Sequence, residues 1–383
     1  MIANAELQEF YKVIIRDSII RLALLGTTGL AVVPNMTAAD SPADNPGVDA
    51  INSVDHKSAG FREGKIIGAP IPMLTPTLGA GLAIVGGYIF KFDEKSESSF
   101  FGLGGFYTDN DSFGYGAAAK LNFMEDTWRI DFFAGDVRLN YDLGTGDSLI
   151  PLTQESPVAR LGVQYSFAED MYVGVRGTYM DNTLSRSSGT GILPPEVALV
   201  AHASIAIGEL TFEADTLDDS NYPTSGHDVF VSVGYGDIVS GGSGSFNKAY
   251  TNMDYFMPLG KGVLATELTL CNADSGTPFF LQCSIGGTDH LRGFSATEFL
   301  GGSLASLQTE YRGMFSKRFG YAAFLGAGFL GDPLSSTVDE FNYSYGVGVR
   351  FRVSTAFKVD FSVDIARNNY HDNQVTVYLG QRF

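Results

Sequence analysis

The stretch "FNYSYGVGVRFRV", residues 341–353, alternates strictly between two kinds of side chain. The apolar and aromatic set is Phe341, Tyr343, Tyr345, Val347, Val349, Phe351 and Val353. The intervening polar or glycine set is Asn342, Ser344, Gly346, Gly348, Arg350 and Arg352. A period of two indicates a β-strand whose two faces meet different surroundings.

The same alternation recurs in "FKVDFSVDI" (residues 357–365) and in "SLASLQTEYRGMF" (residues 303–315). Two architectures explain it. A soluble sandwich buries the apolar face against a second sheet. A membrane barrel turns the apolar face to lipid and keeps charges such as Glu310 and Arg312 in its lumen.

Three features favour the membrane barrel over the soluble sandwich. The alternating segments hold 9 to 14 residues, close to the roughly 9–11 that a tilted strand needs to cross a bilayer. Tight and long turns alternate, and the chain ends on a strand at Phe383, which we interpret as the closing strand because a bilayer cannot satisfy an open sheet edge. We therefore predict an all-β fold, a 16-stranded antiparallel transmembrane β-barrel. Its predicted spans are 78–91, 98–108, 112–123, 127–135, 136–144, 157–168, 171–182, 205–217, 225–238, 246–257, 261–271, 302–315, 319–330, 341–353, 356–367 and 374–383. The fourth and fifth spans have an alternative, in which "WRIDFFAGDVRLNYDL" (residues 128–143) forms one long strand.

The N-terminus has the pattern of a cleavable signal peptide. Basic residues precede the apolar run "LALLGTTGLAVV" (residues 22–33), and small residues up to Ala39 follow it. A retained anchor is the alternative, but a transmembrane helix needs roughly 20 apolar residues. We predict a signal peptide at 1–39, a short polar periplasmic lead-in at 40–73 and a barrel at 74–383, located in an outer membrane of the Gram-negative type.

Composition argues against two other classes of function. The formal net charge of −18 opposes nucleic-acid binding, which needs a basic face. The five histidines are scattered without a metalloprotease or serine-elbow motif, and the neighbours Asp289 and His290 are interpreted as an incidental pair. We therefore expect no enzyme activity, no metal and no cofactor.

Four segments resemble the BamA/TamA surface-antigen superfamily, which comprises outer-membrane assembly factors and two-partner-secretion translocators. They are "GGTDHLRGF" (286–294), "GGSLASLQTEYR" (301–312), "FGYAAFLGAGFLGD" (319–332) and the C-terminal "VTVYLGQRF" (375–383). The last contains the C-terminal barrel signal Tyr378, Gly380 and Phe383. The resemblance covers roughly residues 74–383, and the short lead-in leaves no room for the periplasmic POTRA domains, so a member without them is expected.

The resemblance implies that the long surface loop, residues 272–301, folds into the lumen as a plug. The plug-loop motif is Gly286, Gly287, Leu291, Arg292, Gly293 and Phe294. A guanidinium in a semi-enclosed lumen needs a carboxylate, and alternation turns Glu310 inward, with Phe324 inward on the next strand. The alternative is an ordinary solvated loop.

The chain departs from the family pattern at two positions. Gly326 stands where an inward aspartate is usual, and Leu217 replaces the arginine of the family's acidic periplasmic turn. Either Glu310 alone holds the loop, or another carboxylate such as Asp360 or Asp364 substitutes for the missing one.

Cys271 and Cys283 are the only cysteines. An exported compartment favours a disulfide between them over free thiols. Such a bond would restrain the plug loop.

Two functions remain open. The first is an insertase or translocase that passes client proteins or lipids through a lateral seam between residues 78–91 and 374–383, in contact with outer-membrane lipid. Glycines in "TLGAGLAIVGG" (residues 77–87) weaken strand pairing at this seam. The second is a passive pore or structural barrel.

Overall fold

A computed structural model describes residues 60–144, 149–187, 198, 201–219, 221–286, 291–331, 340–354 and 358–382. The predicted signal peptide, most of the predicted lead-in, Gly287, the Asp289–His290 pair and Phe383 lie outside these described residues. Among the described residues, no helix is both long enough and apolar enough to cross a membrane.

The described residues form strands and two short 3-10 helices. Their bounds are η1 (Phe61–Glu63), β1 (Lys65–Thr75), β2 (Gly79–Phe90), β3 (Ser99–Thr108), β4 (Phe113–Phe123), β5 (Trp128–Leu143), β6 (Ile150–Glu155), β7 (Val158–Ala168), β8 (Met171–Arg186), β9 (His202–Asp215), β10 (Gly226–Ser240), β11 (Ser245–Leu259), β12 (Gly262–Ala273), η3 (Phe279–Leu281), β13 (Cys283–Ser284), β14 (Leu300–Gly301), β15 (Ser303–Met314), β16 (Phe319–Gly331), β17 (Glu340–Ser354), β18 (Val359–Asn368) and β19 (Asn373–Leu379).

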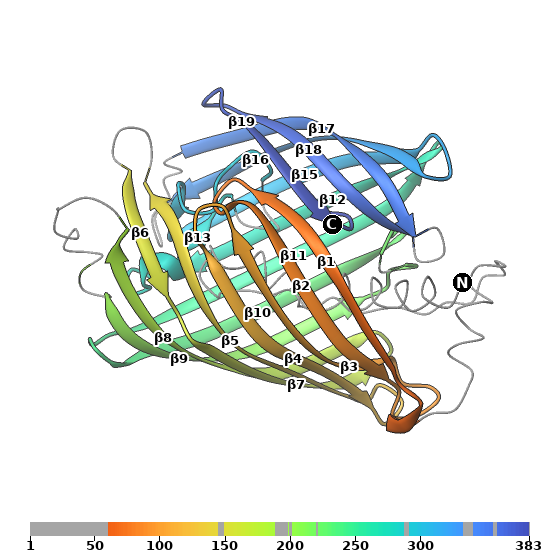
Figure 1. Ribbon diagram of the computed structural model, residues 1–383, viewed down its shortest axis with the longest axis horizontal. Helices are drawn as coiled ribbons and strands as arrows, with labels where there is room; N and C mark the ends of the chain where they lie inside the picture. The colour runs from red at the N-terminus through yellow and green to blue at the C-terminus, as the bar shows by residue number, and fades with distance from the viewer. Residues whose placement is uncertain are drawn as a thin grey trace.

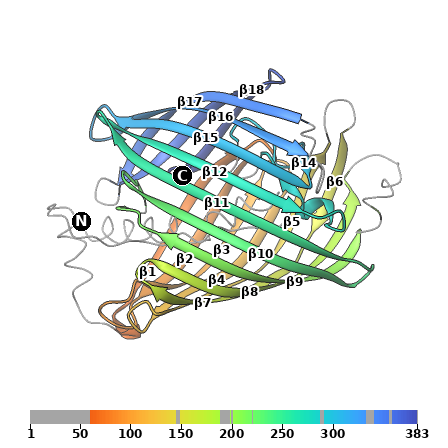
Figure 2. The same ribbon diagram turned by 180° about the vertical axis from the view of Figure 1, so that it is seen from behind.

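The main sheet closes on itself as a barrel, shown from two sides in Figures 1 and 2. Within the described residues it contains seventeen strands, of which β6 is a six-residue strand that extends the wall between β5 and β8. The other sixteen pair antiparallel with their neighbours, and β1 meets β19 to close the ring. The predicted fold class, an antiparallel 16-stranded barrel, is confirmed.

The exposure of side chains follows the predicted alternation. On β17, Tyr345 and Val347 are 53% and 60% exposed, whereas Ser344 and Arg350 are 2% and 1% exposed. The apolar face therefore lies on the outside of the barrel and the polar face lines the lumen, as a membrane barrel requires.

The start of the barrel differs from the prediction. The first strand is β1 (Lys65–Thr75), which lies largely in the predicted lead-in at 40–73, so the barrel begins before residue 74. The sequence hides this strand because Pro70 and Pro72 fall inside it, and proline within a run argues against a strand or restricts it to a sheet edge. The seam consequently joins β1 to β19, and the predicted first span, 78–91, corresponds to β2.

The predicted spans 127–135 and 136–144 are also wrong, because they form the single strand β5. Alternation continues without a break from Arg129 through Phe133 to Tyr141, all buried on the inner face, and no turn interrupts the segment. The missed β1 and the divided β5 compensate each other, which is why the predicted number of strands is nevertheless correct.

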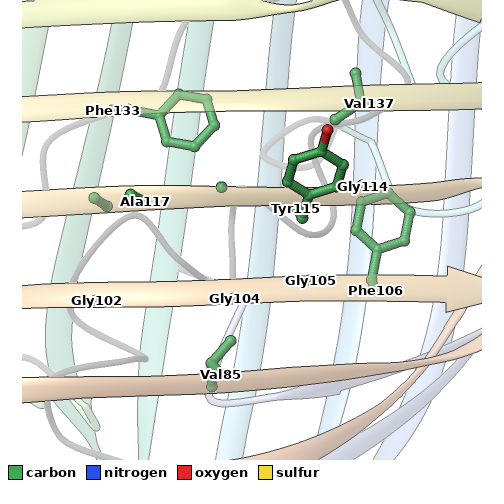
Figure 3. A pocket seen from close by; sticks show the side chains of 12 residues that line it. Val85, Gly102, Gly104, Gly105, Phe106, Gly114, Tyr115, Ala117, Phe133 and Val137 are labelled. Atoms are coloured by element: carbon green, nitrogen blue, oxygen red, sulfur yellow. The ribbon is translucent and has the colours of Figure 1, made fainter.

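The inner face of β2–β5 around Phe106, Gly116 and Phe133 is apolar and rich in glycine, and we call this region the apolar wall (Figure 3). The buried Arg129 of β5 lies outside this region and pairs with Glu97 and Glu213. Gly104 lies opposite Gly116, which lies opposite Gly135 on β5. A Cβ on Gly116 would lie 2.8 Å from the ring of Phe133, and one on Gly114 would lie 2.6 Å from a ring carbon of Phe106. The glycines therefore allow aromatic rings to lie against the strands, beside a cavity of about 40 Å³.

Candidate functional site

The site begins with Arg292, in the long connection between β12 and β15. Its Nη1 lies 2.5 Å from Oε2 of Glu310 on β15 and 3.0 Å from Oδ2 of Asp364 on β18. Its Nε donates a hydrogen bond to Oε1 of Gln308 at 2.9 Å. The side chain is 1% exposed. A buried guanidinium therefore meets two carboxylates and an amide oxygen that line the lumen.

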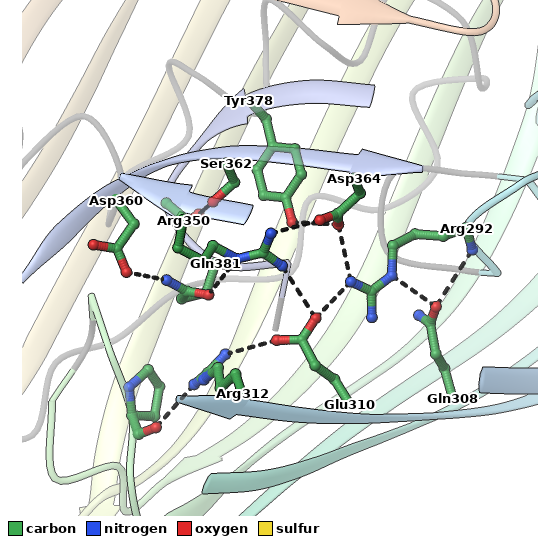
Figure 4. A network of polar contacts seen from close by, with 12 residues as sticks. Arg292, Gln308, Glu310, Arg312, Arg350, Asp360, Ser362, Asp364, Tyr378 and Gln381 are labelled. Carbon is green, nitrogen blue, oxygen red and sulfur yellow. Dashed lines mark hydrogen bonds and ion pairs between the residues drawn. The ribbon is translucent and has the colours of Figure 1, made fainter. Parts of the chain in front are cut away.

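Two further groups complete a buried network around this arginine (Figure 4). Arg350 on β17 lies 2.5 Å from Asp364 and 3.3 Å from Glu310, so both carboxylates are shared between two guanidinium groups. Tyr378 on β19, predicted only as part of the C-terminal signal, donates a hydrogen bond to Asp364 at 2.8 Å. Burying these charges carries a desolvation penalty. Because each carboxylate contacts two guanidinium groups, the attraction between them offsets that penalty.

A second branch reaches the periplasmic end of the barrel. Arg312 lies 3.7 Å from Glu310, and its Nη2 donates to the carbonyl oxygen of Pro223 in the β9–β10 turn at 2.8 Å. The ring of Tyr222 in the same turn lies 5.0 Å from the guanidinium of Arg312 and 4.6 Å from that of Arg352. The site therefore extends from a surface loop to a turn at the opposite end.

The inward residues of β15–β19 that form this network are called the ion-pair wall. They are Gln308, Glu310, Arg312, Arg350, Arg352, Asp360, Asp364 and Tyr378. Asp360, one of the two alternative carboxylates, pairs with Arg352 at 2.7 Å rather than with Arg292. Asp364, the other alternative, is the one that contacts Arg292.

The packing of the loop explains the missing family aspartate. A Cβ on Gly326 would lie 2.5 Å from Cδ2 of Leu291, so the space beside this position is filled by the loop itself. Phe324, two residues earlier, places its ring centroid 3.6 Å from the Arg292 guanidinium, within range of a cation–π contact. The arginine thus has an aromatic face on β16 and its second carboxylate on β18.

The glycines of the motif have separate local roles. Gly293 has φ 98°, a conformation that favours glycine, and its carbonyl oxygen accepts a hydrogen bond from Asn368 at 3.0 Å. A Cβ on Gly286 would lie 2.2 Å from the carbonyl oxygen of Ser295, so the two arms of the loop approach too closely for a side chain. In the C-terminal signal, Gly380 has φ 97° and its N–H bonds to the Asp360 carbonyl oxygen at 2.7 Å.

The loop also contacts the other side of the barrel mouth. The backbone N–H of Ala296 donates to Oγ1 of Thr77 in the β1–β2 turn at 3.2 Å. The hydroxyl of Thr297 donates to the carbonyl oxygen of Asp142 at the end of β5 at 2.8 Å. Phe294 packs edge-on against Phe299, with ring centroids 5.4 Å apart. Residues 291–299 therefore cross the mouth between the two walls.

The two cysteines are joined in a disulfide, with Cα atoms 5.8 Å apart. Cys271 lies near the end of β12 and Cys283 begins β13, so the bond attaches the base of the loop to the barrel. The second anchor is the pairing of β13 with β14, in which Ser284 lies opposite Leu300. Among the described residues, no group of three or more His, Cys, Asp or Glu side chains could hold a metal ion.

The seam between β1 and β19 is the shortest ladder of the ring. A single Cα pair, Leu74 opposite Val377, joins the two strands. The β1–β2 ladder, by contrast, runs from Lys65 opposite Ile89 to Thr75 opposite Gly79. Two residues of β1, Pro70 and Pro72, have no N–H to donate to a neighbour.

The family of the chain follows from a comparison with known protein families. A model of the Omp85 superfamily domain matches residues 100–383, well over half of the chain. The chain therefore belongs to the Omp85 superfamily. This membership indicates an outer membrane of the Gram-negative type as its location. A search of curated proteins finds no match.

Solved structures show the same fold. BamA from Haemophilus ducreyi lacking POTRA domains 1–3 is similar with a TM-score of 0.57 and 14% identity, over 82% of this chain and 69% of that one. CdiB from Escherichia coli has a TM-score of 0.58 and 12% identity, over 82% and 62%. CdiB from Acinetobacter baumannii has a TM-score of 0.54 and 13% identity, over 82% and 59%. The chain spans about three fifths of the length of the two CdiB chains.

Proposed function

We propose that this barrel inserts or translocates client proteins, or lipids, at the outer membrane by opening laterally between β1 and β19. The observation that carries the proposal is the single paired position at Leu74 and Val377. Each backbone hydrogen bond contributes roughly 0.5–1.5 kcal/mol net, so a ladder this short separates at a smaller cost than any full-length ladder. The Omp85 membership supports this function over catalysis.

In this proposal, residues 291–299 act as a plug that is released or rearranged when the seam opens. The buried contacts of Arg292 with Glu310 and Asp364 support this role, because they hold the loop against the inner wall. The contact of Ala296 with Thr77 supports coupling, since Thr77 lies in the turn that joins β1 to β2. Displacing the loop therefore removes a contact from the strand pair that borders the seam.

The first experiment separates a plugged translocase from a passive pore. Conductance is measured in planar bilayers for the wild type and for a variant lacking residues 284–296. A plugged barrel is expected to be nearly closed until the segment is removed, and then to conduct steadily. A stable open channel of equal conductance in both proteins would identify a passive pore instead.

The second experiment tests the seam directly. The double variant L74C/V377C introduces a disulfide at the paired position of the seam, and L82C/Y107C places one at a matched outward pair of β2 and β3. A photoreactive residue at Val375, an exposed residue of β19, reports whether nascent outer-membrane polypeptides reach the seam in cells. We expect oxidation of L74C/V377C, but not of L82C/Y107C, to abolish this cross-linking. Equal cross-linking in both oxidised variants would contradict lateral opening.

A further inference from the structure

The outer surface of the barrel carries a depression that the proposed function does not use. It has a volume of about 610 Å³ and lies over β12 and β15–β18. Six of the residues that line it are Leu264, Thr309, Ala323, Tyr345, Ile365 and Arg367. This volume falls within the roughly 300–1,000 Å³ typical of ligand sites.

The depression lies where two short side chains are diagonal neighbours on adjacent strands. Thr309 on β15 lies opposite Leu325, and Ala323 on β16 lies between Tyr311 and Val347. The small threonine and alanine form the floor, and the longer neighbours form the sides. The depression is therefore a groove in an otherwise filled apolar face.

The groove runs across the strands rather than along them. Two register rows border it: the upper row runs through Arg367, Tyr345, Leu325 and Thr309, and the lower row through Ile365, Val347, Ala323, Tyr311 and Leu264, so that together they span five strands. Four strand spacings of about 4.8 Å give a length of roughly 19 Å. Because barrel strands tilt by about 35–45°, these rows descend diagonally from the surface rim towards the middle of the membrane. The length of the groove is comparable with half of a roughly 30 Å hydrocarbon core.

A charge stands at the upper end of this groove. Arg367 is exposed on the outer face, one residue before β18 ends at Asn368. Its Nη1 donates to the neutral Oδ1 of Asn373 at 3.4 Å. A cation on the lipid face is tolerated near the interface, where it costs roughly 0–1 kcal/mol. A guanidinium there is suited to a phosphate, which it can bind with two parallel hydrogen bonds.

We propose that this groove binds a phosphate-bearing lipid of the surface leaflet. The phosphate contacts Arg367, and one acyl chain lies along the groove over Thr309 and Ala323. The charge at the rim and the apolar channel leading down from it match the two halves of such a lipid. This site is separate from the seam and from the ion-pair wall.

Native mass spectrometry of the purified full chain in mild detergent tests the proposal. The probes are dimyristoylphosphatidylglycerol and, as its partner without phosphate, dimyristoylglycerol. We expect one phosphatidylglycerol to be retained per barrel in preference to the glyceride. The variant R367Q is expected to bind it roughly fivefold more weakly, the contribution of one basic residue to an anionic lipid. A323F is expected to reduce the binding of both probes, because it fills the floor.

The matched control is R138Q. Arg138 also faces outward near the surface end of a strand, but on β5, away from the groove, and its Nη1 lies 3.6 Å from Glu155. Retention of phosphatidylglycerol should be unchanged in this variant. Equal affinity in the wild type and R367Q, or an equal loss in R138Q, would show nonspecific annular lipid only and overturn the proposal. R367Q changes one exposed side chain, so this comparison stands even if A323F does not fold.

Discussion

The apolar wall and the ion-pair wall line the same lumen in opposite ways. In the apolar wall, Phe133 lies against Gly116 through contacts that have no preferred direction. In the ion-pair wall, Glu310 and Asp364 each contact two guanidinium groups at 2.5 to 3.3 Å. Dispersion contacts tolerate sliding, whereas charge-assisted hydrogen bonds fix an orientation.

Under the proposed lateral opening, the difference predicts that the apolar wall moves and that the ion-pair wall stays in place. Strand β1, on one side of the proposed seam, leads into the apolar wall. Arg292 is held instead by residues of β15–β18, which lead to β19 on the other side of the seam. A lateral opening can therefore displace β1 and β2 without breaking a buried ion pair of Arg292. Four predictions test this division, from the largest expected effect to the smallest.

Glu310→Ala should destabilise the barrel most. It leaves Arg292, Arg312 and Arg350 with one fewer buried carboxylate, and breaking a buried pair costs about 3–5 kcal/mol. The free energy of unfolding by urea in detergent measures the loss. The matched control is Glu155→Ala, whose half-exposed pair with Arg138 contributes at most about 1 kcal/mol. Equal losses in the two variants would mean that the buried ion pairs of Glu310 contribute no more than an exposed pair.

Replacing both cysteines by serine should cost about 3 kcal/mol, the loop-closure value for a ring of this length. The bond joins positions that are 12 residues apart. The shift in the urea midpoint between oxidised and reduced wild type measures the effect, and the double-serine variant should not respond to reductant. No shift in the wild type would mean that the ion-pair wall holds the loop without the bond.

Tyr222→Leu should cost about 1 kcal/mol. It keeps an apolar group in the β9–β10 turn but removes the aromatic face between Arg312 and Arg352. Tyr222→Phe retains that face and should unfold at the same urea concentration as the wild type. If the phenylalanine variant is as unstable as the leucine variant, the hydroxyl and not the ring stabilises this end of the ion-pair wall.

The smallest effect is expected in the β4–β5 turn, at the periplasmic end of the apolar wall. Burial, together with the nearby Glu97 carboxylate, raises the pKa of Asp126 from 3.8 to about 6. Because the folded state then binds more protons than the unfolded state between about pH 4 and 6, this group lowers stability as pH rises through that window. Asp126→Asn should flatten this part of the stability profile, measured by urea unfolding from pH 4 to 7. An unchanged profile would exclude Asp126 as its source.

The sequence predicts the fold well because a period of two reports directly which side chains meet lipid. The sequence does not predict β1, because Pro70 and Pro72 argue against a strand. Only the structure shows that β1 pairs with β2 along its length in spite of these prolines. The pair of Arg292 and Glu310 could be proposed because parity alone turns Glu310 inward. The choice between Asp360 and Asp364 could not be made, because it depends on the register of strands that are distant in sequence.

The contact of Tyr222 with Arg312 was not predicted for a related reason. It joins a turn after β9 to the inner face of β15, and no local pattern links these segments. Leu217, noted only as a departure, is buried in the same turn beside Tyr222 in a small apolar cluster. An aromatic residue next to proline in that turn was the only local signal available.

The anchoring of the loop sets how far its arginine can travel. Arg292 lies eight residues from Ser284 and eight from Leu300, the two ends held together by β13 and β14. Eight extended residues reach at most about 29 Å. A released Arg292 therefore remains within that distance of the barrel rim. Because the tether confines it to a small volume, it can rebind Glu310 and Asp364 without a long diffusive search.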